Sequence, residues 1–281
     1  MRLVTFTAAG IEHCGRIEGE RVAVTAARSM DELLLAPAAP AVATLALSEV
    51  QLLAPLPRPR TIRDFYAFEA HVKNARARRG LAMQPEWYQF PVFYFSNPNA
   101  VYGPGADVPR PRTTQMLDFE LEVAAVIGTE CRDVAPEDGD RYIAGYMIMN
   151  DWSARDIQRE EMKVGLGPAK GKDFASSFGP WLVTPDELAD RRDGFRHRLE
   201  MVARIGGREV SRGNLADIHF HFGELIARAS QDCTLYPGEV IGSGTVGTGC
   251  LLETEAAPWL QPGDVVELEV ERLGVLTNTV R

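Results

Sequence analysis

Glu120 and Glu122 are separated by one residue and lead into an apolar run, AAVIG. On a β-strand, residues two apart point to the same face, so both carboxylates would project together. Two like charges this close repel each other unless a cation lies between them. Oxygen ligands of this kind suit a hard divalent cation such as Mg²⁺, Mn²⁺ or Ca²⁺. A solvent-exposed strand face is the alternative for an isolated Glu-x-Glu pair, but the apolar run that follows favours burial.

Two aspartates could complete such a site. Asp151 follows the apolar segment YMIMN, which would place its carboxylate at the end of a buried strand. Asp64 begins a segment that is predicted to be a helix from Asp64 to Gly80, where an N-cap is the alternative role of its side chain. Sequence spacing alone does not bring the four carboxylates into one site.

His71 and Lys172 are candidates for proton transfer and charge stabilisation. His71 lies seven residues after Asp64, so on a continuous helix the two side chains could face the same way. A histidine titrates near neutrality, which suits a general base, although a structural role is commoner on a partly apolar helix. Lys172 lies in GKDFASSFGPW, where a surface lysine in a glycine-flanked loop is the alternative.

The run GSGTVGTG, residues 242–249, supplies glycines for close backbone approach and Thr245 as a hydroxyl donor. It is not a phosphate-binding loop, because it lacks the Lys-Ser or Lys-Thr that ends such a loop. A basic cluster could hold the distal carboxylate of a dicarboxylic substrate or simply form a solvated helix face; it consists of Lys73, Arg76, Arg78 and Arg79.

The elements that would carry these residues are mostly strands. LDFELEVAAVIG and FPVFYFSN are typical of strands, NDWS precedes a predicted helix, and the C-terminal third has strands between glycine turns. Residues 1–55 form a small β-rich unit in which AAPAVATLALSEV is a candidate helix. The prolines of VQLLAPLPRPRT mark a linker, so the sequence predicts a boundary near residue 55 and a catalytic domain over 56–281. The fold class is therefore β-rich α+β.

Composition excludes several classes of function. The 281 residues are 45% hydrophobic and 25% charged, as in ordinary globular proteins. A net charge of −9 argues against nucleic acid or an anionic membrane as the main partner. The N-terminus lacks a signal-peptide pattern, and no apolar run is long enough for a transmembrane helix. The four scattered cysteines fit free thiols in a reducing cytoplasm.

Five segments in order resemble the fumarylacetoacetate hydrolase family over about residues 60 to 275: RDFYAFEAHVKNA, LDFELEVA, MNDWSARDIQ, GKDFASSFGPW and GSGTVGTG. The resemblance implies a mixed β-sandwich roll with a small, variable N-terminal domain, assembled as a homodimer. It also implies one divalent cation, Mg²⁺ or Mn²⁺ with Ca²⁺ as a further option, on four ligands: Asp64, Glu120, Glu122 and Asp151.

The resemblance further implies roles for residues around the cation. His71 would be the general base on water, and Lys172 would stabilise a developing enolate together with the cation. Three residues would line the substrate site, with the last of them binding a substrate carboxylate: Tyr66, Gln158 and Thr245.

The carboxylate that would orient His71 departs from the simplest family pattern. Some short members have a glutamate three residues after the histidine, where this chain has Asn74. Members closer to the founding hydrolase take a glutamate from the C-terminal region, and Glu253 is the candidate here. Glu69 is nearer in sequence but points elsewhere on a helix.

The predicted function is hydrolysis of a carbon–carbon bond in a 1,3-diketo acid, such as an acylpyruvate or a compound like fumarylacetoacetate or fumarylpyruvate, in aromatic catabolism. An alternative keeps the same site and decarboxylates, isomerises or hydrates a 2-oxo dicarboxylate. A third possibility is a metal-binding or ligand-binding protein without catalysis.

Overall fold

The structure is a computed structural model that describes all residues from Met1 to Arg281. It is 22% helical and 37% strand, which confirms the β-rich fold class and the likeness to the fumarylacetoacetate hydrolase fold. No helix is long and apolar enough to cross a membrane.

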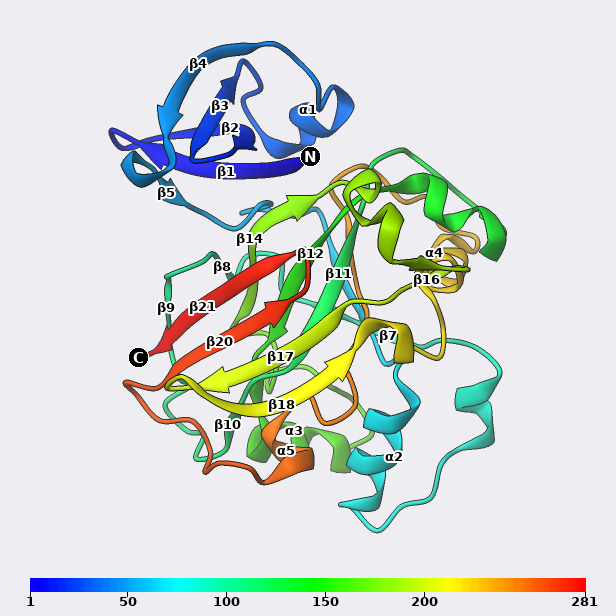
Figure 1. Ribbon diagram of the computed structural model, residues 1–281. Helices are drawn as coiled ribbons and strands as arrows, with labels where there is room; N and C mark the ends of the chain where they lie inside the picture. The colour runs from blue at the N-terminus through cyan, green and yellow to red at the C-terminus, as the bar shows by residue number, and fades with distance from the viewer.

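The N-terminal strands form the blue part at the top of Figure 1. They are β1 (Arg2–Ala8), β2 (Ile11–Glu18), β3 (Arg21–Thr25), β4 (Ala41–Ala46) and β5 (Gln51–Leu52), with helix α1 (Met30–Leu35) between β3 and β4. The prediction of a helix in AAPAVATLALSEV is wrong, because residues 41–46 pair antiparallel with β3 as strand β4. The true helix, α1, precedes this segment and packs its buried Leu33 and Leu34 into the core.

A large mixed sheet runs through the centre of the molecule. Its central strands lie in the order β14 (Ser176–Val183), β12 (Ile143–Asp151), β11 (Leu121–Ile127), β19 (Val240–Gly242), β6 (Ile62–Phe65) and β7 (Phe93–Ser96). Strand β1 pairs with β14 and so joins the N-terminal strands to this sheet, and the short β8 (Val101–Tyr102) pairs with β14 as well. All neighbours among these central strands are antiparallel except β19 and β6, which are parallel.

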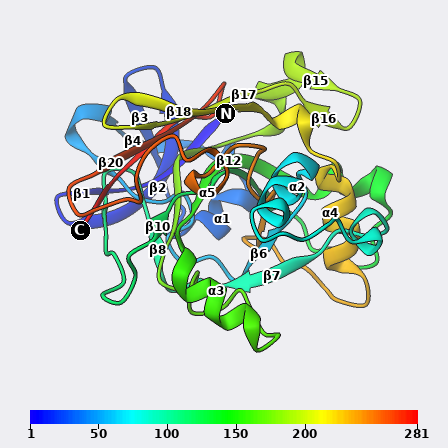
Figure 2. The same ribbon diagram turned by 90° about the horizontal axis from the view of Figure 1, so that it is seen from below.

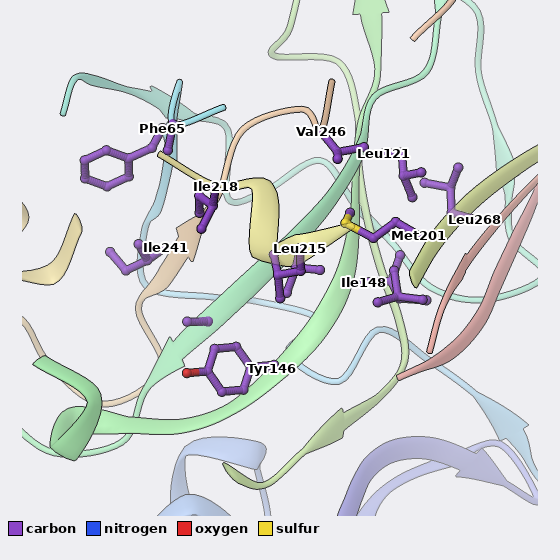
Figure 3. Close-up of a cluster of buried hydrophobic side chains, with 14 of the residues drawn as sticks. Phe65, Leu121, Tyr146, Ile148, Met201, Leu215, Ile218, Ile241, Val246 and Leu268 are labelled. Atoms are coloured by element: carbon purple, nitrogen blue, oxygen red, sulfur yellow. The ribbon is translucent and has the colours of Figure 1, made fainter. Parts of the chain in front are cut away.

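A second sheet packs on the first. It contains β18 (Arg208–Asn214), β17 (Glu200–Ile205), β20 (Val265–Val270), β21 (Gly274–Val280) and β9 (Asp107–Val108), and it lies in front of β11, β12 and β14 in Figure 1. Leu121 and Ile148 of the central sheet share one buried cluster with Met201 and Leu268 of the second sheet (Figure 3). Burial of this apolar surface holds the two sheets together.

The longer helices are α2 (Glu69–Ala77), α3 (Arg155–Lys163) and α4 (Phe222–Ser230), and a short α5 (Leu251–Thr254) contacts α2. Figures 1 and 2 agree that α2, α3 and α5 lie at the same end of the molecule. The remaining strands are short pairs: β10 (Leu117–Asp118) with β13 (Ser153–Ala154), and β15 (Arg192–Asp193) with β16 (Arg196–His197).

The predicted helix from Asp64 to Gly80 is wrong in its first part. Residues 62–65 form strand β6, which is paired with β19 on one side and with β7 on the other. Helix α2 starts only at Glu69, so Asp64 and His71 do not share one continuous helix. Local sequence suggested a helix, and pairing on both sides of β6 overrode it.

Strand direction explains why one edge of the central sheet collects the acidic residues. Because β12 and β6 run opposite to β11, the carboxyl ends of β12 and β6 meet the amino end of β11. Asp151 ends β12, Asp64 lies near the end of β6, and Glu122 lies near the start of β11.

Candidate active site

Four carboxylates converge at this edge of the sheet. Asp64, Glu120, Glu122 and Asp151 each offer an oxygen atom, and these four atoms lie within 4.8 Å of one another. All four residues are buried, with Glu122 and Asp151 fully excluded from solvent. Glu120 lies just before β11 rather than within it, because the expected single strand is broken between β10 and β11.

Three oxygens in this cluster have no hydrogen-bond partner: Asp64 Oδ1, Glu122 Oε2 and Asp151 Oδ1. A buried polar atom without a partner is costly, and a buried carboxylate is more so. A cation among these oxygens would satisfy all three at once. Since every donor is a carboxylate oxygen, the cluster fits a hard divalent ion such as Mg²⁺ or Mn²⁺.

Two buried cations offset part of the negative charge. The Lys172 ammonium donates to both Glu120 and Asp151. Arg155 contacts Glu120 Oε1 through a terminal guanidinium nitrogen at 2.8 Å and donates from Nε to Asp118 Oδ2 at 2.8 Å. The interpretation of Lys172 as a surface lysine is therefore wrong, and Arg155 makes a structural ion pair.

The pKa values of the four carboxyl groups shift in different directions: those of Asp64, Glu122 and Asp151 are raised, and that of Glu120 is lowered. Burial, followed by the charge of Asp151, raises the pKa of Asp64 well above its usual value, and burial together with Asp64 does the same to Glu122. Burial acts in the same direction on Glu120, but Lys172 and Arg155 outweigh it and lower its pKa. Lys172 only partly offsets the negative charge at Asp64, and a bound cation would neutralise more of the charge on the Asp64–Glu122 side of the cluster.

Gly242 makes room for this arrangement. A Cβ atom at residue 242 would lie 2.4 Å from Asp64 Oδ1 and 3.0 Å from the sulfur of Met149. The residue lies opposite Asp64 in the β19–β6 pair, so only glycine leaves space for the carboxylate. This is the close approach that the glycine-rich run predicts.

His71 lies beside the cluster and is held by Glu253. The His71 Nδ1 and Glu253 Oε1 atoms are 2.5 Å apart, and both side chains are buried. The other carboxylate oxygen, Oε2, accepts from Asn74 Nδ2 at 2.8 Å and from the backbone N–H of Thr248 at 3.0 Å. Burial raises the pKa of Glu253, but the His71 and Asn74 contacts outweigh it and lower the pKa.

Glu253 thus supplies the carboxylate beside His71 that some family members place at the position of Asn74. Asn74 instead fixes the C-terminal glutamate by donating to it, so the two positions cooperate. Glu69 pairs with Lys73 on the exposed side of α2, away from His71.

The predicted substrate residues lie around the same space. The Thr245 hydroxyl donates to Glu122 Oε1 at 3.3 Å, and Gln158 accepts from Arg155 at 3.3 Å. The Tyr66 ring meets His71 edge-on, with ring centroids 5.3 Å apart. Burial raises the pKa of Tyr66 to about 12, so its hydroxyl stays protonated at neutral pH.

Two functional side chains were missed in the sequence. Tyr94, on β7, donates its hydroxyl to Asp151 Oδ2. Alternation in FPVFYFSN could have placed Tyr94 and Ser96 on one face of a strand, but nothing local indicated that this face meets Asp151.

Asp118 is the second. One of its oxygens accepts from the backbone N–H of Leu251 at 2.8 Å and the other from Leu252 at 3.0 Å, while Arg155 binds the same carboxylate. Asp118 therefore anchors the start of α5, the short helix that carries Glu253. The sequence LDFELE contains this carboxylate beside the Glu-x-Glu pair, but its partners are distant in sequence.

The comparison with protein families agrees with this geometry. A family model described as "Fumarylacetoacetate (FAA) hydrolase C-terminal" matches residues 60–281. The chain belongs to the fumarylacetoacetate hydrolase family. A second model, described as "Rv2993c-like, N-terminal", matches residues 1–55.

Relatives in this family carry several activities in their names. The 2,4-didehydro-3-deoxy-L-rhamnonate hydrolase of a Sphingomonas species is 34% identical over 68% of this chain and 65% of its own length. The human mitochondrial oxaloacetate tautomerase is 33% identical over 83% of this chain and 70% of its own length. The match thus leaves about a third of each relative uncovered.

Solved structures match over the whole chain. The 5-carboxymethyl-2-hydroxymuconate delta-isomerase of Mycobacterium smegmatis has a TM-score of 0.79 and 28% identity, covering 100% of this chain and 99% of that one. The fumarylacetoacetate hydrolase of Exiguobacterium antarcticum has a TM-score of 0.80 and 27% identity, with the same coverage. Both a hydrolase and an isomerase therefore share this fold.

Proposed function

We propose that this protein is a divalent-metal-dependent enzyme that hydrolyses a carbon–carbon bond in a 1,3-diketo acid of the acylpyruvate or fumarylpyruvate type. The observation that carries the proposal is the buried His71–Glu253 pair beside four converging carboxylates. A paired histidine is the part that water activation needs, and enolate chemistry at a metal does not by itself require it.

Asp64, Glu120, Glu122 and Asp151 would hold the cation. When bound, a divalent cation polarises the oxo-acid oxygens as a Lewis acid and offsets negative charge that develops on them. The three carboxylate oxygens without partners support this assignment.

His71 would take the proton from water. Its Nδ1 atom is committed to Glu253, so Nε2 is the nitrogen left to accept a proton. The Glu253 carboxylate then stabilises the imidazolium that forms. Lys172 places a fixed positive charge at Glu120 and Asp151, where it would stabilise the oxygen of the departing enolate.

The surroundings of Arg79 favour a substrate with a second carboxylate. Its guanidinium donates only to the backbone of Ala75 and to the sulfur of Met162 and has no acidic partner. It lies close enough to Tyr66 to lower the pKa of that phenol against the effect of burial. An unpaired cation beside Tyr66 could bind the distal carboxylate of a compound such as fumarylpyruvate.

The test is an assay of the purified protein with Mg²⁺ or Mn²⁺ on acetylpyruvate, fumarylpyruvate and oxaloacetate, with products identified by mass. We expect pyruvate and the second acid from a 1,3-diketo substrate, and loss of this activity in Glu122→Gln and His71→Ala. Full activity of Glu122→Gln after chelation and dialysis would contradict the metal assignment.

A second candidate is interconversion of tautomers or isomers of a 2-oxo dicarboxylate at the same site. The oxaloacetate tautomerase and the delta-isomerase among the relatives favour it. In this case the assay would show a change in enol absorbance without a new pair of acids. Decarboxylation would be recognised by release of CO₂.

Two further expectations are part of the proposal. The enzyme would act as a homodimer in the cytoplasm, as the family resemblance and the free thiols suggest. Light scattering on the purified protein would decide the oligomeric state.

A further inference from the structure

A second group of metal-binding side chains lies beside the carboxylate cluster. His71, Cys250 and Glu253 each offer a ligand atom, and these three atoms lie within 4.8 Å of one another. All three residues are buried. The group combines a nitrogen, a sulfur and an oxygen donor, whereas the carboxylate cluster offers oxygen alone.

Existing contacts already hold the nitrogen and the sulfur next to one oxygen of Glu253. Glu253 Oε1 lies 2.5 Å from His71 Nδ1 and 3.4 Å from Cys250 Sγ. The opposite oxygen of the same carboxylate is fixed by Asn74 and by the backbone of Thr248. Glu253 is therefore held on one side while its other side faces the nitrogen and the sulfur.

Zinc prefers this set of donors. It binds histidine nitrogen and carboxylate oxygen at about 2.0–2.2 Å and thiolate sulfur at about 2.3 Å, in tetrahedral geometry. Neighbouring ligand atoms in such a site lie about 3.3–3.6 Å apart by that geometry. The sulfur–oxygen separation already fits, and the nitrogen–oxygen contact would need to open by about 0.8 Å on the same geometry.

We propose that His71, Cys250 and Glu253 form a second metal site that takes a thiophilic divalent cation such as Zn²⁺, and that this cation inhibits the enzyme. Metal binding at the site stands on the geometry alone, and the inhibition rests on the proposed function. A water molecule would complete four-coordination, as in other three-ligand zinc sites.

The proton balance explains the inhibition. In the uncomplexed pair, the proposed role of His71 as a base requires its proton on Nδ1, hydrogen-bonded to Glu253, and a free lone pair on Nε2. When Nδ1 binds a cation, that proton moves to Nε2, and the Cys250 thiol releases one proton to solvent. Nε2 is then a donor, so it can no longer accept a proton from water.

The two metal sites should respond to different ions. Mg²⁺ favours carboxylate oxygens and has little affinity for sulfur, so it would not compete at Cys250. Excess Mg²⁺ should therefore leave the inhibition by Zn²⁺ in place, whereas a chelator that removes Zn²⁺ should relieve it.

Cobalt spectroscopy tests the site without any activity. Co²⁺ is added to the Mg²⁺-loaded protein, and the near-ultraviolet charge-transfer band of a thiolate–cobalt bond is recorded. We expect the band in the wild type and in Cys233→Ser, which removes the exposed cysteine, and its loss in Cys250→Ser and Cys250→Ala. Absence of the band from the wild type, or its persistence in a folded Cys250 variant, would overturn the site.

Inhibition is measured separately with Zn²⁺ at saturating Mg²⁺, each variant against its own uninhibited rate. We expect at least tenfold weaker inhibition of Cys250→Ser than of the wild type or Cys233→Ser. Equal inhibition of all three would show that Zn²⁺ acts at the carboxylate cluster and would overturn the inhibitory role. If no substrate is turned over, the proposed function fails while the cobalt band still decides the site.

Discussion

Replacing Glu122 by glutamine should stabilise the metal-free protein and destabilise the metal-bound one relative to the wild type. Without a cation, Glu122 lies in a buried cluster beside the like charge of Asp64, and burial and Asp64 raise its pKa well above the usual value. Glutamine keeps the shape of the side chain and removes the charge.

The size of the effect follows from the charges involved. Each unit by which a buried carboxyl pKa is raised corresponds to about 1.4 kcal/mol. Two unit charges about 4 Å apart repel by about 4 kcal/mol at an effective dielectric constant of about 20, which is an upper limit here. A gain of about 1–4 kcal/mol in unfolding free energy would raise Tm by about 2–10 °C for a chain of this size.

With saturating metal, the wild type should become more stable than Glu122→Gln. A ligand at 1,000 times its Kd stabilises the native state by about 4.1 kcal/mol, which reaches the top of the range above, and Glu122→Gln loses most of this by losing a charged ligand. The assay is thermal unfolding by circular dichroism of both proteins, in EDTA and in Mn²⁺. The wild type should melt lower in EDTA and higher in Mn²⁺.

Glu239→Gln is the matched control. Glu239 is also a buried glutamate, but it is paired with Arg63 and accepts from Thr61 at 2.9 Å. It is not one of the four clustered carboxylates, and Arg63 and Asp64 are successive residues of β6, so their side chains point to opposite faces of the sheet. Breaking this ion pair should lower Tm in EDTA and in Mn²⁺ alike, at a cost of about 3–5 kcal/mol. If Glu122→Gln behaved like Glu239→Gln, the reasoning about uncompensated charge would be refuted.

Three further predictions concern catalysis and pH. Glu253→Gln should lower kcat about 10-fold to 100-fold, because a hydrogen bond to a charged group contributes about 1.5–3 kcal/mol, while metal binding measured by calorimetry stays intact. Arg79→Gln should raise KM for fumarylpyruvate at least tenfold and leave acetylpyruvate nearly unaffected; equal effects on both would contradict a distal-carboxylate role. The stabilisation by Mn²⁺ should grow with pH. Because the pKa values of Asp64 and Glu122 are raised in the folded state, their protonated carboxyls stabilise the metal-free fold fully at pH values below the usual pKa values of 3.8 and 4.5. This contribution is lost as the pH rises through the raised pKa values and the two groups ionise. Melting curves at a series of pH values above 4 would show a Tm increment that increases with pH, and a constant increment would speak against it.

The sequence was most informative where chemistry and strand period coincide. Glu120-x-Glu122 before an apolar run predicted two carboxylates at a buried strand, and Asp151 at the end of YMIMN predicted a third at a strand end. These residues needed no knowledge of distant contacts, because each stands beside its own buried strand.

Prediction failed where long-range pairing decides the conformation. Asp64 was placed on a helix because its segment has helix-forming residues, yet pairing with β19 and β7 makes it a strand. The role of Asn74 was also invisible, since its partner Glu253 is 179 positions away along the chain. A short helix such as α5 has too few residues to leave a periodic pattern.

The buried pair of Asp118 and Arg155 explains why the two halves of the site come together. Arg155 holds the proposed metal ligand Glu120, and through Asp118 it is tied to the first turn of α5, which carries Glu253. The proposed base and the proposed metal ligands are thus positioned by one ion pair rather than by separate supports. Because both charges are buried, loss of either partner would leave the other uncompensated and disturb both halves at once. The motifs LDFELE and NDWSARD, which were predicted to supply ligands, therefore also connect the proposed cation site with the proposed water-activating base.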